Sequence, residues 1–242
     1  MVTSQLLQRN NLLSLLKPEV QQRLLPLLKL VTIPIGQFVS ETNRPISTVY
    51  FPLSFVASNL RTTEDGVTME ITTIGNEGFV GLPLLLGTQH DSLDSIAQIG
   101  GEGLSMAAED FINTIEDGTT GLRTILLLYV QANIFQMIQN AACNQSHNTA
   151  QRCARWILMT QDRCHETSFI LGHHFITYML HTSKAVVTNT MNGLAQAKLL
   201  TYFGGRITIL DRQRLEQASC LCYGIIQREY DRLLSTHSCV VQ

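Results

Sequence analysis

The chain of 242 residues carries 17 lysines and arginines and 19 acidic residues, which gives a net charge of −2. Its hydrophobic content of 45% and charged content of 15% provide for a packed core and exclude a disordered chain. No apolar run approaches the length that crosses a bilayer, so no membrane contact is expected. Polar residues interrupt the leucine pairs near the N-terminus, which favours an amphipathic helix over a signal peptide and predicts a cytoplasmic protein.

The charge is distributed unevenly along the chain. Residues 1–146 hold seven basic and thirteen acidic side chains, a net charge of −6, whereas residues 147–242 hold ten and six, a net charge of +4. We therefore expect only the C-terminal part to meet a polyanion.

The first hundred residues change from a helical to a strand pattern. Residues 6–29 predict one or two short helices, with Pro18 in the first turn of the second. From Thr32 to about Met106, short β-type runs such as TVYFPLSFVASNL and TMEITTIG alternate with glycine-rich breaks. Asp65-Gly66 lies between two such runs and predicts a tight hairpin turn. Many short strands with regular breaks favour an antiparallel sandwich or roll.

A helical pattern without a break follows from Leu122 to about Cys143. Its apolar residues recur at steps of three and four, which is close to the seam of a coiled coil. The stripe consists of Ile125, Leu128, Ala132, Phe135, Ile138 and Ala142. A helix of this length exceeds what a small roll can cover, so the stripe predicts pairing with a second copy of the chain. The alternative is that the stripe packs only against its own domain.

The C-terminal part predicts a helix-turn-helix and a wing. A helix is expected from Thr149 to about Arg163, with Trp156 in the core and with Arg152 and Arg155 either near phosphates or on a solvated face. Two shorter helices then meet at a tight turn around His181, the second running from Lys184 to about Ala197. The stretch TYFGGRITILDR predicts two strands around a glycine pair.

At this point the chain resembles the Crp/Fnr family of bacterial transcription regulators. The resemblance rests on VYFPLSFVASNLRTTEDGVTMEITTIGNEGFVGLPLLLG, the long central helix and GRITILDRQRLEQASCLCYGIIQREYDRLL, and it covers nearly the whole length. It implies an α+β fold with an antiparallel β-roll of the cyclic-nucleotide-binding type, a jelly roll, over residues 1–120. A dimerisation helix over 121–146 and a winged helix-turn-helix DNA-binding domain over 147–242 would follow.

The resemblance also implies a homodimer that binds double-stranded DNA with two-fold-related half-sites, and RNA polymerase as a further partner. The DNA-facing positions of the second helix would be Ser183, Lys184, Ala185, Thr188 and Asn189. Thr182 at the helix N-terminus and Arg206 on the wing are further candidates for phosphate contacts.

Two departures from the family pattern affect the DNA-binding head. His181 stands where the turn usually carries glycine, which makes the left-handed conformation more costly but still accessible. Lys184 is the one cation that the recognition helix offers before Lys198, so arginine-to-guanine contacts are unavailable there. The sequence therefore predicts a DNA-reading scaffold with few charge contacts.

The roll contains a segment similar to the start of the family's cyclic-nucleotide cassette. The matching residues, which form the candidate effector pocket, are Gly75, Glu77, Gly78, Phe79, Gly81 and Leu82. Glu77 could take a ribose hydroxyl, but no Lys or Arg lies between Arg61 and Arg123 to bind the cyclic phosphate. We therefore expect no tight binding of cyclic AMP and a structural role for the glycines; the effector stays unknown.

The six cysteines predict reduced, mostly buried thiols and no cofactor. The first is Cys143, so the N-terminal cysteine set of an Fnr-type iron–sulfur cluster is missing. Cys164-His165 and His173-His174 are adjacent pairs, which rarely converge on one ion. Cys220 and Cys222 are interpreted as two residues of one terminal helix that face different ways, so no metal site is predicted.

The leading hypothesis is a DNA-binding transcription regulator without enzymatic activity, because no nucleophile–base pair, P-loop, HExxH or Rossmann motif is present. The alternative is a ligand- or protein-sensing scaffold of the same fold with weakened DNA binding. The sparse recognition helix and His181 motivate this second hypothesis.

Overall fold

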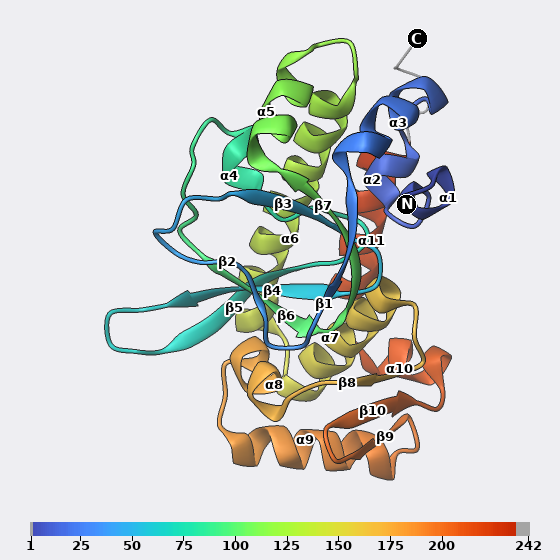
Figure 1. Cartoon of the computed structure of the whole chain (residues 1–242). Coiled ribbons are helices and arrows are strands. Elements are labelled where there is room, and N and C mark those ends of the chain that lie inside the picture. The colour runs from blue at the N-terminus through green and yellow to red at the C-terminus, as the bar shows by residue number, and fades with distance from the viewer. Residues whose placement is uncertain (1, 236–242) are drawn as a thin grey trace.

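Short helices open the chain in the computed structural model, which describes residues 2–235 (Figure 1). They are α1 (Ser4–Leu7), α2 (Asn11–Ser14), α3 (Pro18–Leu24) and the 3-10 helix η1 (Leu25–Leu27). Pro18 is the first residue of α3, as predicted. Asn10 caps α2, and its amide donates to the carbonyls of Pro52 and Gly78 at 3.0 Å each. These bonds attach the opening helices to the sheet that follows.

Two antiparallel sheets form the roll. Its strands are β1 (Lys29–Ile33), β2 (Phe38–Ser40), β3 (Thr48–Pro52), β4 (Val56–Thr62), β5 (Thr68–Ile74), β6 (Asp94–Ile99) and β7 (Gly101–Ala107). One sheet has the order β1-β7-β3 and the other β2-β6-β4-β5. The hairpin predicted at Asp65-Gly66 joins β4 to β5, with Gly66 at a φ of 81°. The predicted antiparallel roll is therefore confirmed.

Aromatic side chains fill the space between the roll and the helices that cover it. Phe79 lies fully buried among Phe51, Phe111 and Tyr129, with ring centroids 5.6 to 6.0 Å apart. Phe111 comes from α5 (Ala108–Glu116), which with α4 (Leu82–Leu85) lies at one end of the roll.

Helix α6 (Leu122–Ser146) is the long helix that the sequence predicted. One side of it packs against the roll and buries Ile125, Tyr129 and Ala132 within the same chain. Ile125 and Ala132 therefore cannot belong to an interface with a second copy, and the prediction for these two residues is wrong. The physical reason is that other elements of the same chain, namely α11, α5 and strand β5 of the roll, pack against this helix.

The winged helix-turn-helix follows α6 and forms the other end of the molecule (Figure 1). Its elements are α7 (Thr149–Cys164), β8 (Ser168–Ile170), α8 (His173–Leu180), α9 (Lys184–Gln196), β9 (Leu200–Phe203), β10 (Arg206–Ile209) and α10 (Arg212–Ala218). The three strands pair in the order β8-β10-β9. Trp156 is buried, as predicted.

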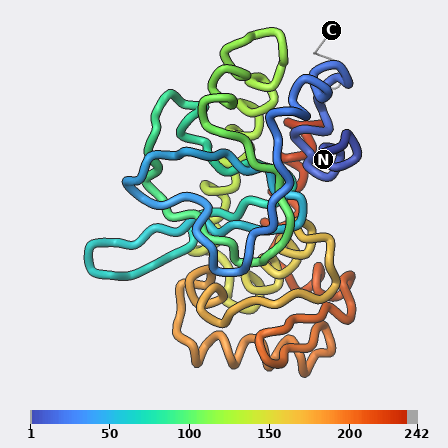
Figure 2. The backbone as a smooth tube through the Cα atoms, viewed as in Figure 1, coloured from blue at the N-terminus to red at the C-terminus, as the bar shows by residue number. Residues whose placement is uncertain are grey.

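The last described helix, α11 (Cys222–Leu234), returns from the winged end toward the N-terminal helices (Figure 2). It packs along α6, where Tyr230 lies against Tyr129 and donates its hydroxyl to Gln136 at 3.1 Å. Because α11 begins at the winged end and finishes beside the roll, it links the two. Within residues 2–235, none of the helices combines the length and the apolar character that a bilayer crossing requires.

Candidate DNA-binding surface

Helices α8 and α9 meet at the turn that the sequence predicted. His181 ends α8 in the left-handed conformation, at a φ of 48° and a ψ of 55°. Ser183 then caps α9, and its hydroxyl accepts a hydrogen bond from the amide of Val186 at 3.4 Å. The departure from glycine at His181 therefore leaves the turn geometry intact.

The inner faces of both helices hold the head together. Four apolar residues of α8 are buried, and Val187, Met191 and Leu194 of α9 pack against them. These are the inward positions that the sequence predicted from steps of three and four. With this face fixed, the opposite side of α9 is left free for a ligand.

The outer face of α9 carries every residue that the sequence placed there. Ser183, Lys184, Ala185, Thr188 and Asn189 are exposed, and Thr182 is half-buried in the turn. The hydroxyl of Thr188 donates to the carbonyl of Lys184 at 2.9 Å, which leaves its lone pairs available as acceptors. Their contact with DNA stays a prediction.

The wing extends from the same end of the molecule. Gly204 and Gly205 join β9 to β10 with φ angles of 57° and 78°, which only glycine adopts readily at two successive positions. Arg206 is exposed at the start of β10, with its guanidinium 3.4 Å from the hydroxyl of Ser168. Phe203 stands out from the tip with 89% of its surface exposed.

Sequence reasoning missed three exposed residues of this surface, namely Phe203, Asn192 and Gln196. Asn192 and Gln196 lie four and eight residues after Thr188, so extending the helical period along α9 would have found them. Phe203 had no comparable signal, because its exposure depends on where the wing ends.

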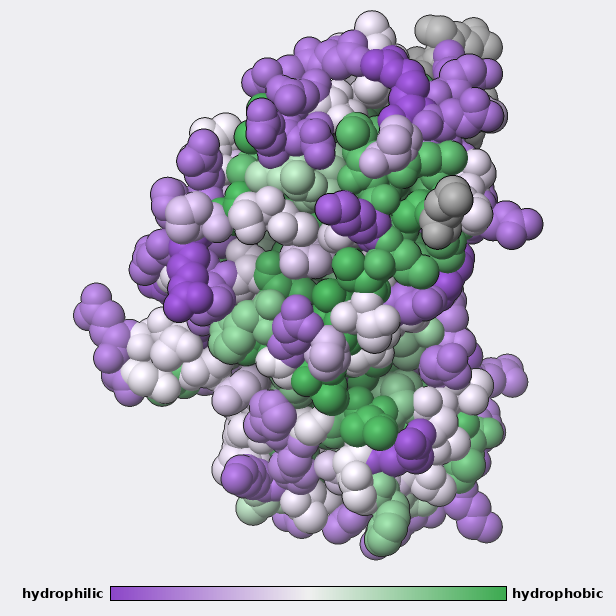
Figure 3. Space-filling view, in the orientation of Figure 1, coloured by the Kyte–Doolittle hydropathy of each residue, from purple (hydrophilic) through white to green (hydrophobic). Residues whose placement is uncertain are grey.

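Arg152 and Arg155 are turned away from this surface. Arg155 is buried and donates to Asn140 of α6 at 2.8 Å, and Arg152 donates to Asn144 at 2.9 Å. Both guanidinium groups therefore bind the long helix, so neither of the two positions considered from the sequence, near phosphates or on a solvated face, describes Arg155. Hydrophilic and pale residues are intermixed over the winged end in Figure 3.

The candidate effector pocket is occupied by the protein's own side chains. Glu77 forms an ion pair with Arg163 of α7 at 2.7 Å, and both side chains are nearly buried. The side chain of Arg163 also fills the space beside Gly75, and that of Tyr129 fills the space beside Gly78. Any larger residue at these two glycines would collide with α7 or α6, which supports the structural role expected for them.

The remaining residues of the candidate effector pocket also occupy positions that serve the fold. Phe79 belongs to the aromatic core, Gly81 adopts a φ of 121°, and Leu82 begins α4. A cleft of about 860 Å³ opens beside the Glu77–Arg163 ion pair, where the roll, α7 and α11 meet, and both of these side chains line it. Its lining includes Arg9, Glu102 and His165.

The exposed side of α6 carries an apolar seam that is shifted from the predicted stripe. Ile138 is 62% exposed, and Leu127 and Ile134 are exposed as well. Leu128 and Phe135 are half-buried, and Ala142 is exposed. Leu127, Gln131, Ile134, Ile138 and Ala141 follow one another at steps of four, three, four and three, which is the heptad spacing of a coiled coil.

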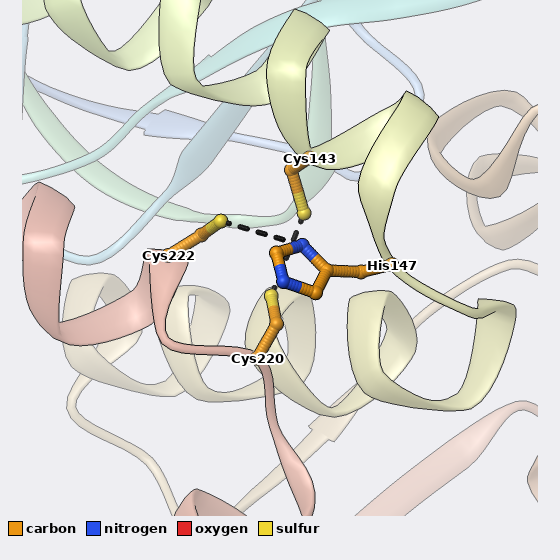
Figure 4. Close-up of side chains that lie close together, drawn as sticks. All are labelled: Cys143, His147, Cys220 and Cys222. Atoms are coloured by element: carbon orange, nitrogen blue, oxygen red, sulfur yellow. Dashed lines mark hydrogen bonds between the residues drawn. The ribbon is translucent and has the colours of Figure 1, made fainter.

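The cysteines of the described residues are buried, as predicted, whereas Cys239 lies outside those residues. Burial raises the pKa of the Cys153 thiol to about 12. Cys143, His147, Cys220 and Cys222 lie close together, with ligand atoms that could hold a metal ion (Figure 4). The argument against a shared site for Cys220 and Cys222 was wrong, because Cys220 precedes α11 and the two do not share a helix.

Comparison with known proteins gives a family match for the winged end. The profile of the Crp-like helix-turn-helix domain matches residues 151–218. No curated protein matches the sequence.

Solved structures match the fold along most of the chain. FixK2 from Bradyrhizobium japonicum is 14% identical, with a TM-score of 0.66 over 80% of this chain and 98% of its own. A putative Crp/Fnr-family transcriptional regulator from Eubacterium rectale is 14% identical, with a TM-score of 0.63 over 87% of this chain and 98% of its own. The c-di-GMP-responsive global regulator CLP from Xanthomonas campestris is 12% identical, with a TM-score of 0.63 over 80% and 99%.

These TM-scores establish a shared fold, and the domain match adds the helix-turn-helix. The protein thus carries a Crp-like helix-turn-helix domain, on a β-roll and long-helix fold that it shares with solved structures of Crp/Fnr regulators.

Proposed function

We propose that the protein is a sequence-specific transcription regulator that binds double-stranded DNA as a homodimer, in the cytoplasm and without catalysis. The observation that supports this most is the placement of α9. The exposed N-terminal residues of α9 and the wing lie together at the end of the molecule remote from the roll (Figure 1). A helix presented in this way fits the major groove of a duplex.

The chemistry of the outer face fits a few specific base contacts. Lys184 can bind guanine, and the amide of Asn189 can pair with both the acceptor and the donor of adenine. The N-terminus of α9 at Ser183 offers backbone amides to a phosphate, and Arg206 offers a cation from the wing. Phe203 adds an apolar contact of the kind that a thymine methyl group accepts.

The seam on α6 supports the homodimer. Leu127, Ile134 and Ile138 are large apolar side chains that water covers in a single chain. Two copies of the helix packed along this seam would remove them from water and relate the two heads by a two-fold axis. Half-sites about 10 base pairs apart, on one face of the duplex, would then match the two α9 helices.

Gating by cyclic AMP is not part of the proposal. A ribose hydroxyl would have to displace Arg163 from Glu77, which leaves a buried cation without its partner. In addition, no Lys or Arg lies between Arg61 and Arg123 to bind the phosphate. Calorimetric titration of the purified protein with cyclic AMP should show no binding at micromolar concentrations, and a micromolar affinity would contradict this part of the proposal.

A scaffold with weakened DNA binding is the second candidate, and it is favoured by the single lysine among the outer residues from Thr182 to Gln196. Selection of duplexes from a random library at low and moderate salt separates the two. The proposed function predicts enrichment of a two-fold-related sequence at both salt concentrations. Binding that is lost at moderate salt, with no enriched sequence, would instead support the scaffold.

A further inference from the structure

Three cysteines and one histidine converge where α6 ends and α11 begins (Figure 4). Cys143 lies in the last turn of α6, and His147 follows four residues later as its C-cap. Cys220 lies between α10 and α11, and Cys222 is the first residue of α11. Two segments about 75 residues apart in sequence thus meet through these four side chains, whose ligand atoms all lie within 4.8 Å of one another.

The separations match those of a tetrahedral metal site. The sulfurs of Cys143 and Cys220 are 3.5 Å apart, and the sulfur of Cys222 lies 3.6 Å from Nδ1 of His147. Bonds of about 2.3 Å to sulfur and about 2.0 Å to nitrogen place two sulfurs about 3.8 Å apart and a sulfur and a nitrogen about 3.5 Å apart in a tetrahedron. An ion could therefore bind with small movements of the side chains.

The surroundings of these three thiols differ from those of an ordinary core cysteine. A buried thiol usually packs as a small apolar group, as Cys153 does against the sulfur of Met191 at 3.7 Å. Cys143, Cys220 and Cys222 instead form a buried cluster of their own, with polar partners on its edge. His147 is half-buried, which leaves a route to solvent for an incoming ion.

We propose that Cys143, His147, Cys220 and Cys222 bind one Zn²⁺ ion in a closed, structural site. Three sulfur ligands and one imidazole in a tetrahedron are the donor set that zinc favours. Because the protein fills all four positions, no place is left for water or a substrate, and the ion serves to hold the fold. The thiol protons are released to solvent on binding, and the ion with three thiolates carries a net charge of −1.

Neighbouring side chains can stabilise the net negative charge of the ion and its three thiolates. The buried guanidinium of Arg155 lies close enough to act electrostatically on Cys143 and Cys220. The amide of Gln139, one turn before Cys143 on α6, donates to the sulfur of Cys222 at 3.1 Å. Contacts of this kind orient metal ligands and stabilise thiolates.

The ion would fix the junction between the two ends of the molecule. His147 ends α6, and the next residue, Asn148, caps α7 at the start of the winged helix-turn-helix. Cys222 starts the helix that returns along α6 to the roll. A metal bridging these points would hold the DNA-binding head in one orientation relative to the long helix, independently of which ligand the head binds.

Metal analysis of the full-length protein, purified under reducing conditions, tests the site. We expect about one zinc per chain. The zinc-stripped protein should bind Co²⁺ with the absorption bands of a tetrahedral site and of thiolate-to-metal charge transfer. Replacement of Cys222 by Ser, or of the half-buried His147 by Ala, should weaken zinc binding at least about 100-fold in competition with a chelator. Cys164→Ser, a buried thiol outside the cluster, is the matched control and should bind like the unmodified protein.

His147→Ala is the variant least prone to disturb folding, since its side chain is half-buried. Circular dichroism of each variant shows whether it is folded before metal is added. A folded, reduced protein that binds neither Zn²⁺ nor Co²⁺ at micromolar concentrations would overturn the proposal. Zinc binding that is unchanged in both Cys222→Ser and His147→Ala would overturn the assignment of these ligands.

Discussion

Glu70 and Glu77 are two carboxylates of the roll that contact α7 in different ways. Glu77 meets a cation, Arg163, at 2.7 Å. Glu70 accepts hydrogen bonds from the hydroxyl of Ser58 and from the indole of Trp156, the latter at 2.8 Å. Burial raises the pKa of Glu70 to about 7, although these hydrogen bonds and the more distant Arg163 and Arg155 act in the opposite direction. Glu77 is thus paired with a cation, whereas the pKa of Glu70 lies near neutral pH.

The raised pKa of Glu70 makes stability depend on pH. Between its unfolded value of 4.5 and about 7, the folded state binds more protons than the unfolded state, so the free energy of unfolding falls as pH rises through this window. Glu70→Gln should remove on the order of 1–3 kcal/mol of this fall, measured by urea unfolding from pH 5 to 8. Glu64→Gln, in the exposed β4–β5 turn, should keep the original slope. Parallel curves for Glu70→Gln and the unmodified protein would contradict the assignment.

Removal of one partner of the buried ion pair should be costly. Arg163→Met leaves Glu77 buried without its cation and should lower the free energy of unfolding by about 3–5 kcal/mol. The double variant Arg163→Met/Glu77→Gln should recover part of the loss, because no charge is left unpaired. A denaturant titration of these two variants and of Glu77→Gln measures the coupling, and a loss below about 1 kcal/mol in Arg163→Met would show that the pair is solvated.

At the scale of elements, features that depend on local sequence were predicted better than features that depend on contacts between distant segments. The helix-turn-helix followed from Ser183 as a cap and from the spacing of Val187, Met191 and Leu194, all of which act within one helix. The wing followed from the glycine pair alone. These features need no knowledge of the rest of the fold, which is why the sequence predicted them.

The predictions that were wrong or missing concern features that depend on packing against other elements. The stripe on α6 was assigned from periodicity, which shows that a helix has apolar faces but does not show which of them other elements of the chain cover. Ile125 and Ala132 were misplaced for this reason. The cluster around Cys143 was missed because the position of Cys220 depends on where α10 ends and α11 begins. The cation for Glu77 came from α7, far along the chain, which no local pattern shows.

The prediction at the scale of elements concerns the apolar seam on α6. Ile138→Asp places a charge in the centre of the proposed interface and should raise the dimer dissociation constant about 100-fold or more, since an unpaired charge would be buried there. Sedimentation velocity over a range of protein concentrations measures the change. Ile35→Asp, an exposed isoleucine of the roll, is the matched control and should leave association unchanged. A dimer that is equally stable in both variants would place the interface elsewhere.

In the whole molecule, several connections join the roll to the DNA-binding head, among them the packing of α8 against β5 and three others. The first is the junction of α6 and α7 at His147 and Asn148. The second is the set of bonds from α7 to the roll, from Trp156 to Glu70 and from Arg163 to Glu77. The third is α11, which packs along α6 (Figure 2). A change in the roll would therefore reach the head through direct contacts.

The central claim is that the N-terminal end of α9 reads a DNA duplex. Fluorescence anisotropy of the selected duplex, measured over a range of salt concentrations, tests it most directly with Lys184→Ala and with Lys17→Ala, which removes an exposed lysine of the N-terminal helices. The account predicts that Lys184→Ala weakens binding about tenfold or more, while Lys17→Ala leaves both the affinity and the salt dependence unchanged. Equal affinities for Lys184→Ala and the unmodified protein at every salt concentration would contradict the account.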